Sequence, residues 1–272
     1  MNKIGIICGG GNLPLSIGIN LINKDYKVCF FCIKNFADPK IYKDFDNIEV
    51  ELTSFTEILK SLKKKNINKI IMVGKISRPT IKDLKFDLNT INLIKHYLLE
   101  SQGDDQLLKS ISNFFLNKGF PLFDWKNECK ELFSSADYLT LMKPTHNAIK
   151  NKNKGLSVFK IIGNADIGQS IVIQNQLILG VECIEGTDQL IKRCNFNKKE
   201  GDRGVLLKLS KYRQHAELDL PTIGLDTVKN LKIFNYEGLF IEKNKCVIIE
   251  KEKVVNFCNE NNLFLATVEK ID

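Results

Sequence analysis

Short apolar runs alternate with helical periodicity through the first half of the chain. The runs that predict strands are Lys3–Cys8, Val28–Ile33, Ile48–Leu52 and Lys69–Val73. Apolar residues at helical spacing follow two of these runs, at Leu15–Asn23 and Phe55–Lys65. Strands that alternate with helices are typical of a parallel sheet covered by its crossover helices. We therefore predict an α/β fold that begins with a Rossmann-like parallel sheet.

Two further helices are predicted after this sheet. One spans Asp87–Leu99, and the next begins at Gly103-Asp104-Asp105 and carries an apolar face. One of the two carboxylates, Asp104 or Asp105, is explained by capping of the free N–H groups in the first turn of this helix. The adjacent second carboxylate leaves a metal or substrate role open.

The second half of the chain predicts a smaller α+β arrangement. Ser170–Gln174 and Leu177–Cys183 form an expected hairpin about a polar turn, and Thr187 begins a helix through Cys194. The remaining expected elements are a strand at Gly204–Leu209, a hairpin of Gly238–Ile241 with Cys246–Ile249 about Asn244, a helix near Lys253–Glu260 and a strand at Leu263–Thr267.

The segment 143–154 is polar and basic and lacks a periodic apolar pattern. We interpret it as a linker. It would join a Rossmann-like N-terminal domain, residues 1–142, to a C-terminal α+β catalytic domain, residues 155–272. A chain of 272 residues with 43% hydrophobic content is long enough to bury the cores of two ordinary domains.

Composition narrows the class of partner. The formal net charge of +8 comes from 40 basic and 32 acidic residues, so the surface is mixed. No clustering of arginine with aromatic residues favours nucleic acid, which we do not expect as a partner. A basic balance suits an anionic membrane surface or a phosphorylated ligand.

Cysteines and leader segments bear on the compartment. The eight cysteines are scattered, mostly inside apolar runs, as is typical of free thiols in a reducing cytoplasm. The Cys29-x-x-Cys32 spacing lies within an apolar strand, which favours core packing over redox or metal chemistry. No signal-like leader and no run of about 18 apolar residues occurs, so we expect a soluble protein, with peripheral membrane contact permitted.

A glycine-rich turn joins the first strand to the first helix. Such a turn can leave main-chain N–H groups free at a helix N-terminus, where they suit a phosphate. The candidate ligand-binding residues are Gly10, Gly11, Asn12, Leu13 and Pro14. Pro14 replaces the third glycine of a dinucleotide fingerprint, and no acidic residue follows near Ile33, which argues against a nicotinamide cofactor. A turn needed only for the fold stays open as an alternative.

Two cations follow the strand that ends at Val73. Lys75 and Arg78 lie beyond its carboxyl end, which is the usual ligand side of an open parallel sheet. We predict that they bind a phosphate; two solvated basic residues on a loop are the alternative.

Acidic residues mark the second domain. Glu182, Glu185 and Asp188 surround Gly186 where a strand passes into a helix. Carboxylates placed close together repel unless a cation lies among them, and Mg²⁺ or Mn²⁺ prefers such oxygen ligands. Charges solvated at a helix start are the open alternative. Asp219 precedes a constrained Pro-Thr-Ile-Gly turn and is the best catalytic candidate.

Six motifs together resemble a known family. In order, they are Gly9-Gly10-Gly11-Asn12-Leu13-Pro14, Gly74-Lys75 with Arg78-Pro79, Gly103-Asp104-Asp105, Asp166-Ile167-Gly168-Gln169, Val181-Glu182-Cys183-Ile184-Glu185-Gly186-Thr187-Asp188 and Asp219-Leu220-Pro221-Thr222-Ile223-Gly224. The set resembles the metal-dependent UDP-2,3-diacylglucosamine pyrophosphatases of lipid A biosynthesis.

The resemblance implies a cytoplasmic enzyme, peripheral to the inner membrane, that releases lipid X and UMP. An aspartate matching Asp219 is implied to be essential. His215 and Glu217 stand where the family tends to have an acidic residue and an arginine, so neither is inherited as functional.

This reading assigns roles to the candidate residues. Hydrolysis of a pyrophosphate needs cations to neutralise charge and a carboxylate to activate water. We expect Asp219 to act with Mg²⁺ or Mn²⁺. The expected metal ligands are Asp166, Glu182, Glu185 and Asp188. Gln169, Thr187 and Thr222 are expected to join the glycine loop, Lys75 and Arg78 in binding substrate.

The expected partner is a lipid-linked nucleotide sugar, with peripheral contact to the inner membrane; a homodimer is left open. The competing class is a non-catalytic nucleotide-binding regulatory protein, which would bind nucleotide without turnover.

Overall fold

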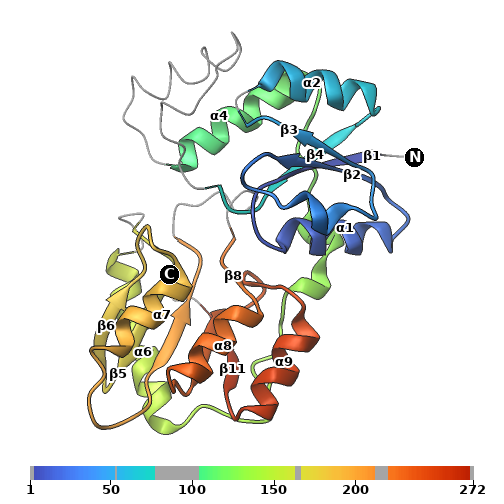
Figure 1. The fold of residues 1–272 in the computed structure, drawn as a ribbon. Helices are drawn as coiled ribbons and strands as arrows, with labels where there is room; N and C mark the ends of the chain where they lie inside the picture. The colour runs from blue at the N-terminus through green and yellow to red at the C-terminus, as the bar shows by residue number, and fades with distance from the viewer. Residues whose placement is uncertain (1–2, 53, 77–103, 163–166, 212–219, 270–272) are drawn as a thin grey trace. The chain divides into compact units, whose positions relative to one another are not determined.

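The computed structural model describes residues 3–52, 54–76, 104–162, 167–211 and 220–269. The chain divides into two compact units, Met1–Cys129 and Lys130–Asp272, which are described separately (Figure 1). The first is a parallel α/β domain and the second has a mixed sheet. The predicted fold class is therefore confirmed.

The N-terminal sheet is entirely parallel. Its strand order is β3-β2-β1-β4. The strands are β1 (Lys3–Cys8), β2 (Lys27–Ile33), β3 (Asn47–Val50) and β4 (Lys69–Val73). The chain steps outward from β1 to β3 and then crosses to the other side of β1 for β4. The order reverses between β1 and β4, and the carboxyl ends of strands at such a point form the ligand crevice of open α/β sheets.

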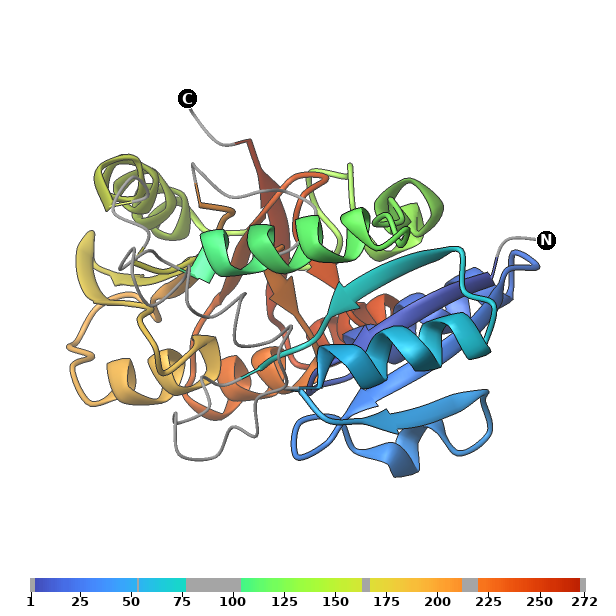
Figure 2. The ribbon, with the colours of Figure 1, turned by 90° about the horizontal axis from the view of Figure 1, so that it is seen from above.

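Helices cover both faces of this sheet. α2 (Phe55–Lys64) and α4 (Asp104–Asn117) lie on one face and α1 (Leu13–Ile22) lies on the other (Figure 1 and Figure 2). Gly18 sets the approach of α1, since a Cβ there would stand 2.2 Å from the Phe30 ring. Short helical turns complete the unit at η1 (Pro39–Tyr42) and α5 (Trp125–Glu128).

The C-terminal sheet is mixed and has the order β11-β9-β7-β5-β6. Strands β7, β9 and β11 are parallel, whereas β5 runs antiparallel to both β7 and β6. Its strands are β5 (Ser170–Gln174), β6 (Leu177–Val181), β7 (Val205–Lys208), β9 (Gly238–Glu242) and β11 (Phe264–Val268). A separate parallel pair consists of β8 (Thr222–Ile223) and β10 (Val247–Ile248).

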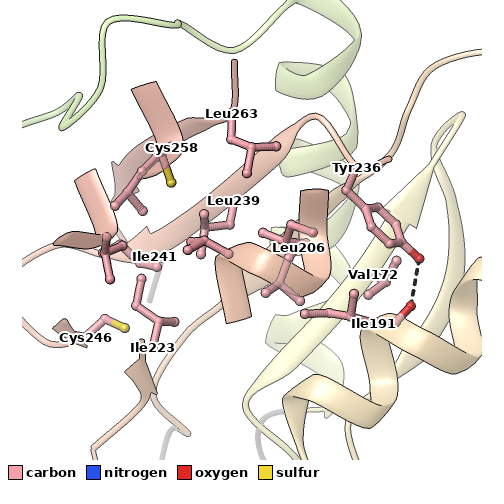
Figure 3. Packing of buried hydrophobic residues seen from close by; sticks show 14 of the residues in the cluster. Val172, Ile191, Leu206, Ile223, Tyr236, Leu239, Ile241, Cys246, Cys258 and Leu263 are labelled. Carbon is pink, nitrogen blue, oxygen red and sulfur yellow. Dashed lines mark hydrogen bonds between the residues drawn. The ribbon is translucent and has the colours of Figure 1, made fainter. Parts of the chain in front are cut away.

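Strand alternation sorts the C-terminal core into two layers. Leu206, Leu239 and Leu265 belong to one cluster, while their neighbours Leu207 and Phe240 belong to another. The first cluster, drawn in Figure 3, packs under α7 (Thr187–Asn195), α8 (Leu225–Ile233) and α9 (Lys251–Glu260). The second lies under α6 (His146–Ile162). Successive side chains of a strand point to opposite faces, so a period of two builds both layers.

One hydrogen bond joins the helical layer to the loop before β9. The Tyr236 hydroxyl is fully buried and donates to the Ile191 carbonyl oxygen at 3.1 Å (Figure 3). A buried hydroxyl needs such a partner, and the bond ties α7 to the start of β9.

The predicted linker is wrong. Residues 146–154 of the segment 143–154 form the first half of α6. The boundary between the two compact units falls between residues 129 and 130 of the chain. Ala148, Asn151, Gly155 and Phe159 are buried along one side of this helix. Its apolar stripe is narrow, and lysines and asparagines between the buried positions conceal the period.

The predicted second hairpin is also wrong. β9 pairs with β7 and β11, whereas β10 pairs with β8, so the two segments belong to different sheets. The first predicted hairpin is confirmed. Asn175 and Gln176 both have positive φ, 51° and 61°, as a tight two-residue turn between twisted strands requires. The helix predicted at Asp87–Leu99 lies outside the described residues.

No helix within the described ranges is long and apolar enough to cross a membrane. The side chains of residues 104–107, at the start of α4, are not described. The roles predicted for Asp104 and Asp105 therefore stay predictions.

We expect Phe159→Ala to lower the free energy of unfolding of the C-terminal domain by about 3–5 kcal/mol. Phe159 is a residue of α6, its side chain belongs to the core cluster under this helix, and the residue is only 1% exposed. Ile161→Ala is the matched control, with a side chain 76% exposed on the same helix. Its change should stay within about 0.5 kcal/mol. Denaturant unfolding followed by circular dichroism measures both, and equal effects would contradict the packing of α6 on the sheet.

Candidate functional site

The glycine turn of the N-terminal domain lies at the switch point of its sheet. Gly9 and Gly74 approach so closely that a Cβ on Gly9 would lie 2.7 Å from the Gly74 carbonyl carbon. Gly10 and Lys75 then exchange two main-chain hydrogen bonds, of 2.7 and 2.9 Å. The turn after β1 and the turn after β4 are thereby joined, and they present one continuous edge.

This pairing changes the expected phosphate site. The N–H of Gly10 donates to the Lys75 carbonyl oxygen and is not free for a ligand. Among described main-chain acceptors, none takes the N–H of Gly11, Asn12 or Leu13. Pro14 has no N–H and lies in the first turn of α1, where its missing donor costs nothing. The amides of this turn without a described main-chain acceptor are therefore those of residues 11–13.

Lys75 is exposed beside this turn, and its role in binding a phosphate stays a prediction. Its main chain is fixed by Gly10, which leaves the side chain to extend from a rigid position. Arg78, its predicted partner, lies outside the described residues.

In the C-terminal domain, polar side chains gather at one edge of the sheet. Ser170 begins β5 opposite Lys208 at the end of β7, and Glu182 follows β6 at the same edge. The Glu182 N–H donates to the Ser170 carbonyl oxygen at 2.8 Å. Thr187, the first residue of α7, contacts all three through its hydroxyl. We call Ser170, Glu182, Thr187 and Lys208 the edge cluster.

The threonine hydroxyl is the centre of the edge cluster. The Lys208 ammonium donates to Thr187 Oγ1 at 2.5 Å, and Thr187 Oγ1 donates to Glu182 Oε1 at 2.9 Å. Ser170 Oγ lies 3.3 Å from the same hydroxyl. Lys208 is 5% exposed and Thr187 is 8% exposed. A buried cation and a carboxylate are thus joined through one hydroxyl.

Gly168 holds the loop that carries Glu182. A Cβ at Gly168 would lie 1.9 Å from the Glu182 carbonyl oxygen, so only glycine allows the two segments to touch. The neighbouring Gln169 carbonyl oxygen accepts from the Leu209 N–H at 2.9 Å, which fixes the chain beside β7. The motif that contains Gly168 and Gln169 therefore shapes this edge of the sheet.

Three of the four predicted metal ligands lie in the described part of the chain, and they have separate partners. Glu185 pairs with Arg193 at 2.8 Å, and Asp188 Oδ1 accepts from Thr227 Oγ1 at 3.1 Å. Glu182 accepts from Thr187, and its Oε2 is buried without a described hydrogen-bond partner. No group of three or more histidine, cysteine or acidic side chains within the described ranges could hold a metal ion. The expected convergence of Glu182, Glu185 and Asp188 is therefore not formed by these three side chains.

The Glu185 ion pair shapes the loop from residue 182 to 186. Glu185 Oε1 accepts from Arg193 Nε at 2.9 Å, and Arg193 Nη2 also donates to the Val181 carbonyl oxygen. Glu185 Oε2 accepts from the Cys183 N–H at 3.2 Å. Burial acts to raise the pKa of Glu185, but the hydrogen bonds and the charge of Arg193 outweigh it and lower the pKa below its usual range.

The remaining predicted residues are not part of the edge cluster or lie outside the described ranges. Thr222 is half-buried at the start of β8, and its hydroxyl donates to the Leu220 carbonyl oxygen at 3.0 Å. Asp166 and Asp219 fall outside the described residues, as do His215 and Glu217.

Sequence reasoning missed Lys208 and Ser170. Lys208 ends an apolar run and is almost fully buried, which is rare for lysine. A charged residue at the carboxyl end of a buried parallel strand was the signal that could have found it. Glu242, 2% exposed at the end of β9, was missed for the same reason; its Oε2 accepts from the Ser210 N–H and hydroxyl.

The fold and these edges define a two-domain protein. An α/β domain with a glycine turn at its switch point precedes an α+β domain with a buried polar cluster at its sheet edge. A model of the LpxI N-terminal domain matches residues 3–132, and a model of the LpxI C-terminal domain matches residues 135–266. The chain carries both domains in order and belongs to the LpxI family.

A curated relative covers the same length. The UDP-2,3-diacylglucosamine pyrophosphatase LpxI of Caulobacter vibrioides is 27% identical to this chain over 276 residues. The match covers 99% of this chain and 98% of the Caulobacter protein. The similarity is distant but spans both domains.

We expect Arg193→Met to raise the pKa of Glu185 and to lower the free energy of unfolding by about 0.5 kcal/mol at neutral pH, the usual size for a partly exposed ion pair. Because the folded pKa of Glu185 is depressed, the wild-type advantage is present above the unfolded pKa, about 4.3. It is lost as the pH falls through the folded value.

Urea unfolding between pH 7 and pH 2.5 measures this difference, and an NMR titration reports the carboxylate directly. Lys192→Met is the control, because Lys192 is exposed on the same helix and has no ion pair with Glu185. An advantage of wild type over Arg193→Met that grows as the pH falls would contradict the assignment.

Proposed function

We propose that this chain hydrolyses the pyrophosphate bond of UDP-2,3-diacylglucosamine to UMP and 2,3-diacylglucosamine 1-phosphate, in lipid A biosynthesis. The match across both domains to the Caulobacter pyrophosphatase is the observation that carries the proposal. Water adds to one phosphorus, the bridging P–O bond breaks, and the water proton passes to a base. The products are two phosphate monoesters.

The N-terminal domain supplies groups suited to the nucleotide or its phosphates. The N–H groups of Gly11, Asn12 and Leu13 lie at the N-terminus of α1, where the helix dipole favours negative charge. Lys75 stands on the turn paired with this one. We assign Arg78 to the same role from its place in the sequence.

The C-terminal domain supplies the reacting carboxylate in this proposal. Asp219 lies in the connection between β7 and β8, whose first part follows Lys208 and whose last part leads to Thr222. A carboxylate there would accept the proton of the attacking water. Gln169 and Thr187, at the adjoining strand and helix ends, are assigned to substrate binding.

The described residues fit a divalent cation only in part. Glu182 has a buried carboxylate oxygen without a described partner, and such an oxygen is suited to a hard cation. Glu185 and Asp188 are held by Arg193 and Thr227 and do not fit this role as they stand. We therefore propose Glu182 as the described ligand, with Asp166 and Asp219 completing the set.

Mg²⁺, or Mn²⁺ in its place, would neutralise charge on the phosphates and lower the pKa of a bound water when it is present. The residues of the chain would orient the two phosphates and take up the proton. We further propose that the protein works in the cytoplasm at the inner membrane, where a substrate with two acyl chains would be held.

Purified protein incubated with UDP-2,3-diacylglucosamine is expected to release UMP, measured by chromatography. Asp219→Ala should lower the turnover number by about 10²–10⁴-fold, the usual contribution of a general base. Asp226→Ala is the matched control, because Asp226 is an exposed aspartate early in α8, and it should turn over like wild type. Saturable UDP binding without UMP release would instead favour a regulatory protein.

Metal dependence has a separate test. EDTA should stop UMP release and added Mg²⁺ should restore it. Glu182→Gln is expected to raise the Mg²⁺ concentration for half-maximal rate by about 10-fold or more, whereas Glu185→Gln should leave it unchanged, because Arg193 holds that carboxylate. Full turnover in EDTA would refute the metal, and equal effects of the two variants would refute the choice of Glu182.

A further inference from the structure

Lys208 is the most buried cation at the described edge of the C-terminal sheet. It ends β7, between β5 and β9, and only 5% of the residue is exposed. Taking an ammonium out of water is costly unless an anion or strong acceptors compensate it. The chain nevertheless places Lys208 where an apolar residue would complete the strand.

The hydrogen bonds of the edge cluster leave donors unused. A lysine ammonium has three N–H donors, and the described partner of Lys208 is Thr187 Oγ1 at 2.5 Å. The threonine has one hydrogen, which Glu182 Oε1 accepts at 2.9 Å. Thr187 Oγ1 must therefore accept from Lys208, so the direction of the chain of bonds is fixed. Two N–H groups of Lys208 have no described acceptor.

The carboxylate of Glu182 does not pair directly with the ammonium. It is one hydroxyl away, so the attraction between the two charges is weaker than in a contact pair. Glu182 Oε2 also has no described donor. The edge cluster thus has spare donors at its lysine end and a spare acceptor at its glutamate end. An anionic group with several acceptor oxygens matches the lysine end.

We propose that Lys208 is a substrate-binding residue whose ammonium, oriented by Thr187, donates to a phosphoryl oxygen of the pyrophosphate. This inference rests on the proposed function for the identity of the phosphoryl group. A phosphoryl oxygen supplies both the negative charge and the acceptors that the buried ammonium lacks. Thr187 acts as a positioning residue, because its hydroxyl is fixed between Glu182 and Lys208.

The test compares binding and stability in Lys208→Met, which removes the charge and keeps the length of the side chain. Thr187 still donates to Glu182 in this variant. We expect the Kd for UDP, measured by calorimetry, to rise by about 10- to 100-fold, the loss of one charge-assisted hydrogen bond. The melting temperature without ligand should not fall, because the buried ammonium has one hydroxyl as its described partner and its removal relieves the cost of taking that charge out of water, while Thr187 still donates to Glu182.

Thr187→Val is the second variant and should weaken UDP binding by a smaller factor than Lys208→Met, since the ammonium remains but loses its orienting acceptor. Lys198→Met is the matched control. Lys198 is a half-buried lysine of the same domain whose ammonium donates to the carbonyl oxygens of Phe234 and Asn235 at 3.0 and 2.8 Å. It should bind UDP as wild type does.

UMP and glucosamine 1-phosphate distinguish the two phosphoryl groups of the substrate. A loss in Lys208→Met that is shared by UDP and UMP assigns the uridine side, and a loss shared by UDP and glucosamine 1-phosphate assigns the sugar side. Unchanged affinity of Lys208→Met for all three ligands would overturn the proposal, as would a wild-type protein that binds none of them. Weaker binding that accompanies a lower melting temperature would overturn it in favour of a structural role.

These outcomes are separable from the proposed function. Weaker UDP binding by Lys208→Met in a protein without turnover would leave the phosphoryl subsite standing and refute the hydrolase. UMP release by Lys208→Met at the wild-type rate and KM would refute the subsite and leave the hydrolase standing.

Discussion

The direction of the strands is the constraint on which the candidate site depends. Three parallel strands, β7, β9 and β11, end at one edge, and the antiparallel strand β5 begins there. Polar residues that are far apart in the sequence lie close together because each is at the end of a strand that reaches this edge. Lys208 ends one strand, Ser170 begins its neighbour, and Glu182 follows the next. Packing of the apolar strand residues fixes where the strands end, and the polar residues at those ends are thereby brought together.

The same constraint acts in the N-terminal domain through glycine. Gly9 and Gly74 let the turns after β1 and β4 touch at a distance that no side chain would allow. Main-chain bonds between Gly10 and Lys75 then occupy the Gly10 amide, whereas the next amides, at the start of α1, have no described main-chain acceptor. A turn that the sequence presents as one uniform glycine loop is therefore divided into a part bonded to the neighbouring turn and a part whose amides have no described main-chain acceptor.

The sequence predicted the features that depend on neighbouring residues alone, namely strand bounds and a tight turn. The bounds of β1, β4 and β5 agree with the apolar runs, since a buried strand needs a continuous apolar face. The turn at Asn175 and Gln176 was recognisable because its residue types tolerate positive φ. The family resemblance, carried by motifs along the whole chain, agrees with the two matched domains, but these matches do not support the metal dependence that it implied.

Nonlocal choices were out of reach of such patterns. β9 and β10 are close in sequence but pair with distant partners, because parallel pairing is decided by the whole sheet. The buried stripe of α6 was hidden by lysine and asparagine on its exposed positions. Proximity in sequence also suggested that Glu182, Glu185 and Asp188 converge, yet Arg193 and Thr227 take two of them away.

The loop that carries Glu182 has one more consequence. Cys183 is the exposed cysteine of the described chain, and the other seven are buried. Its main-chain N–H is fixed by Glu185, one residue beyond the carboxylate that contacts Thr187. A thiol-reactive fluorophore would therefore attach at one defined point beside the polar edge without further mutagenesis, and its emission could report ligand occupancy in real time.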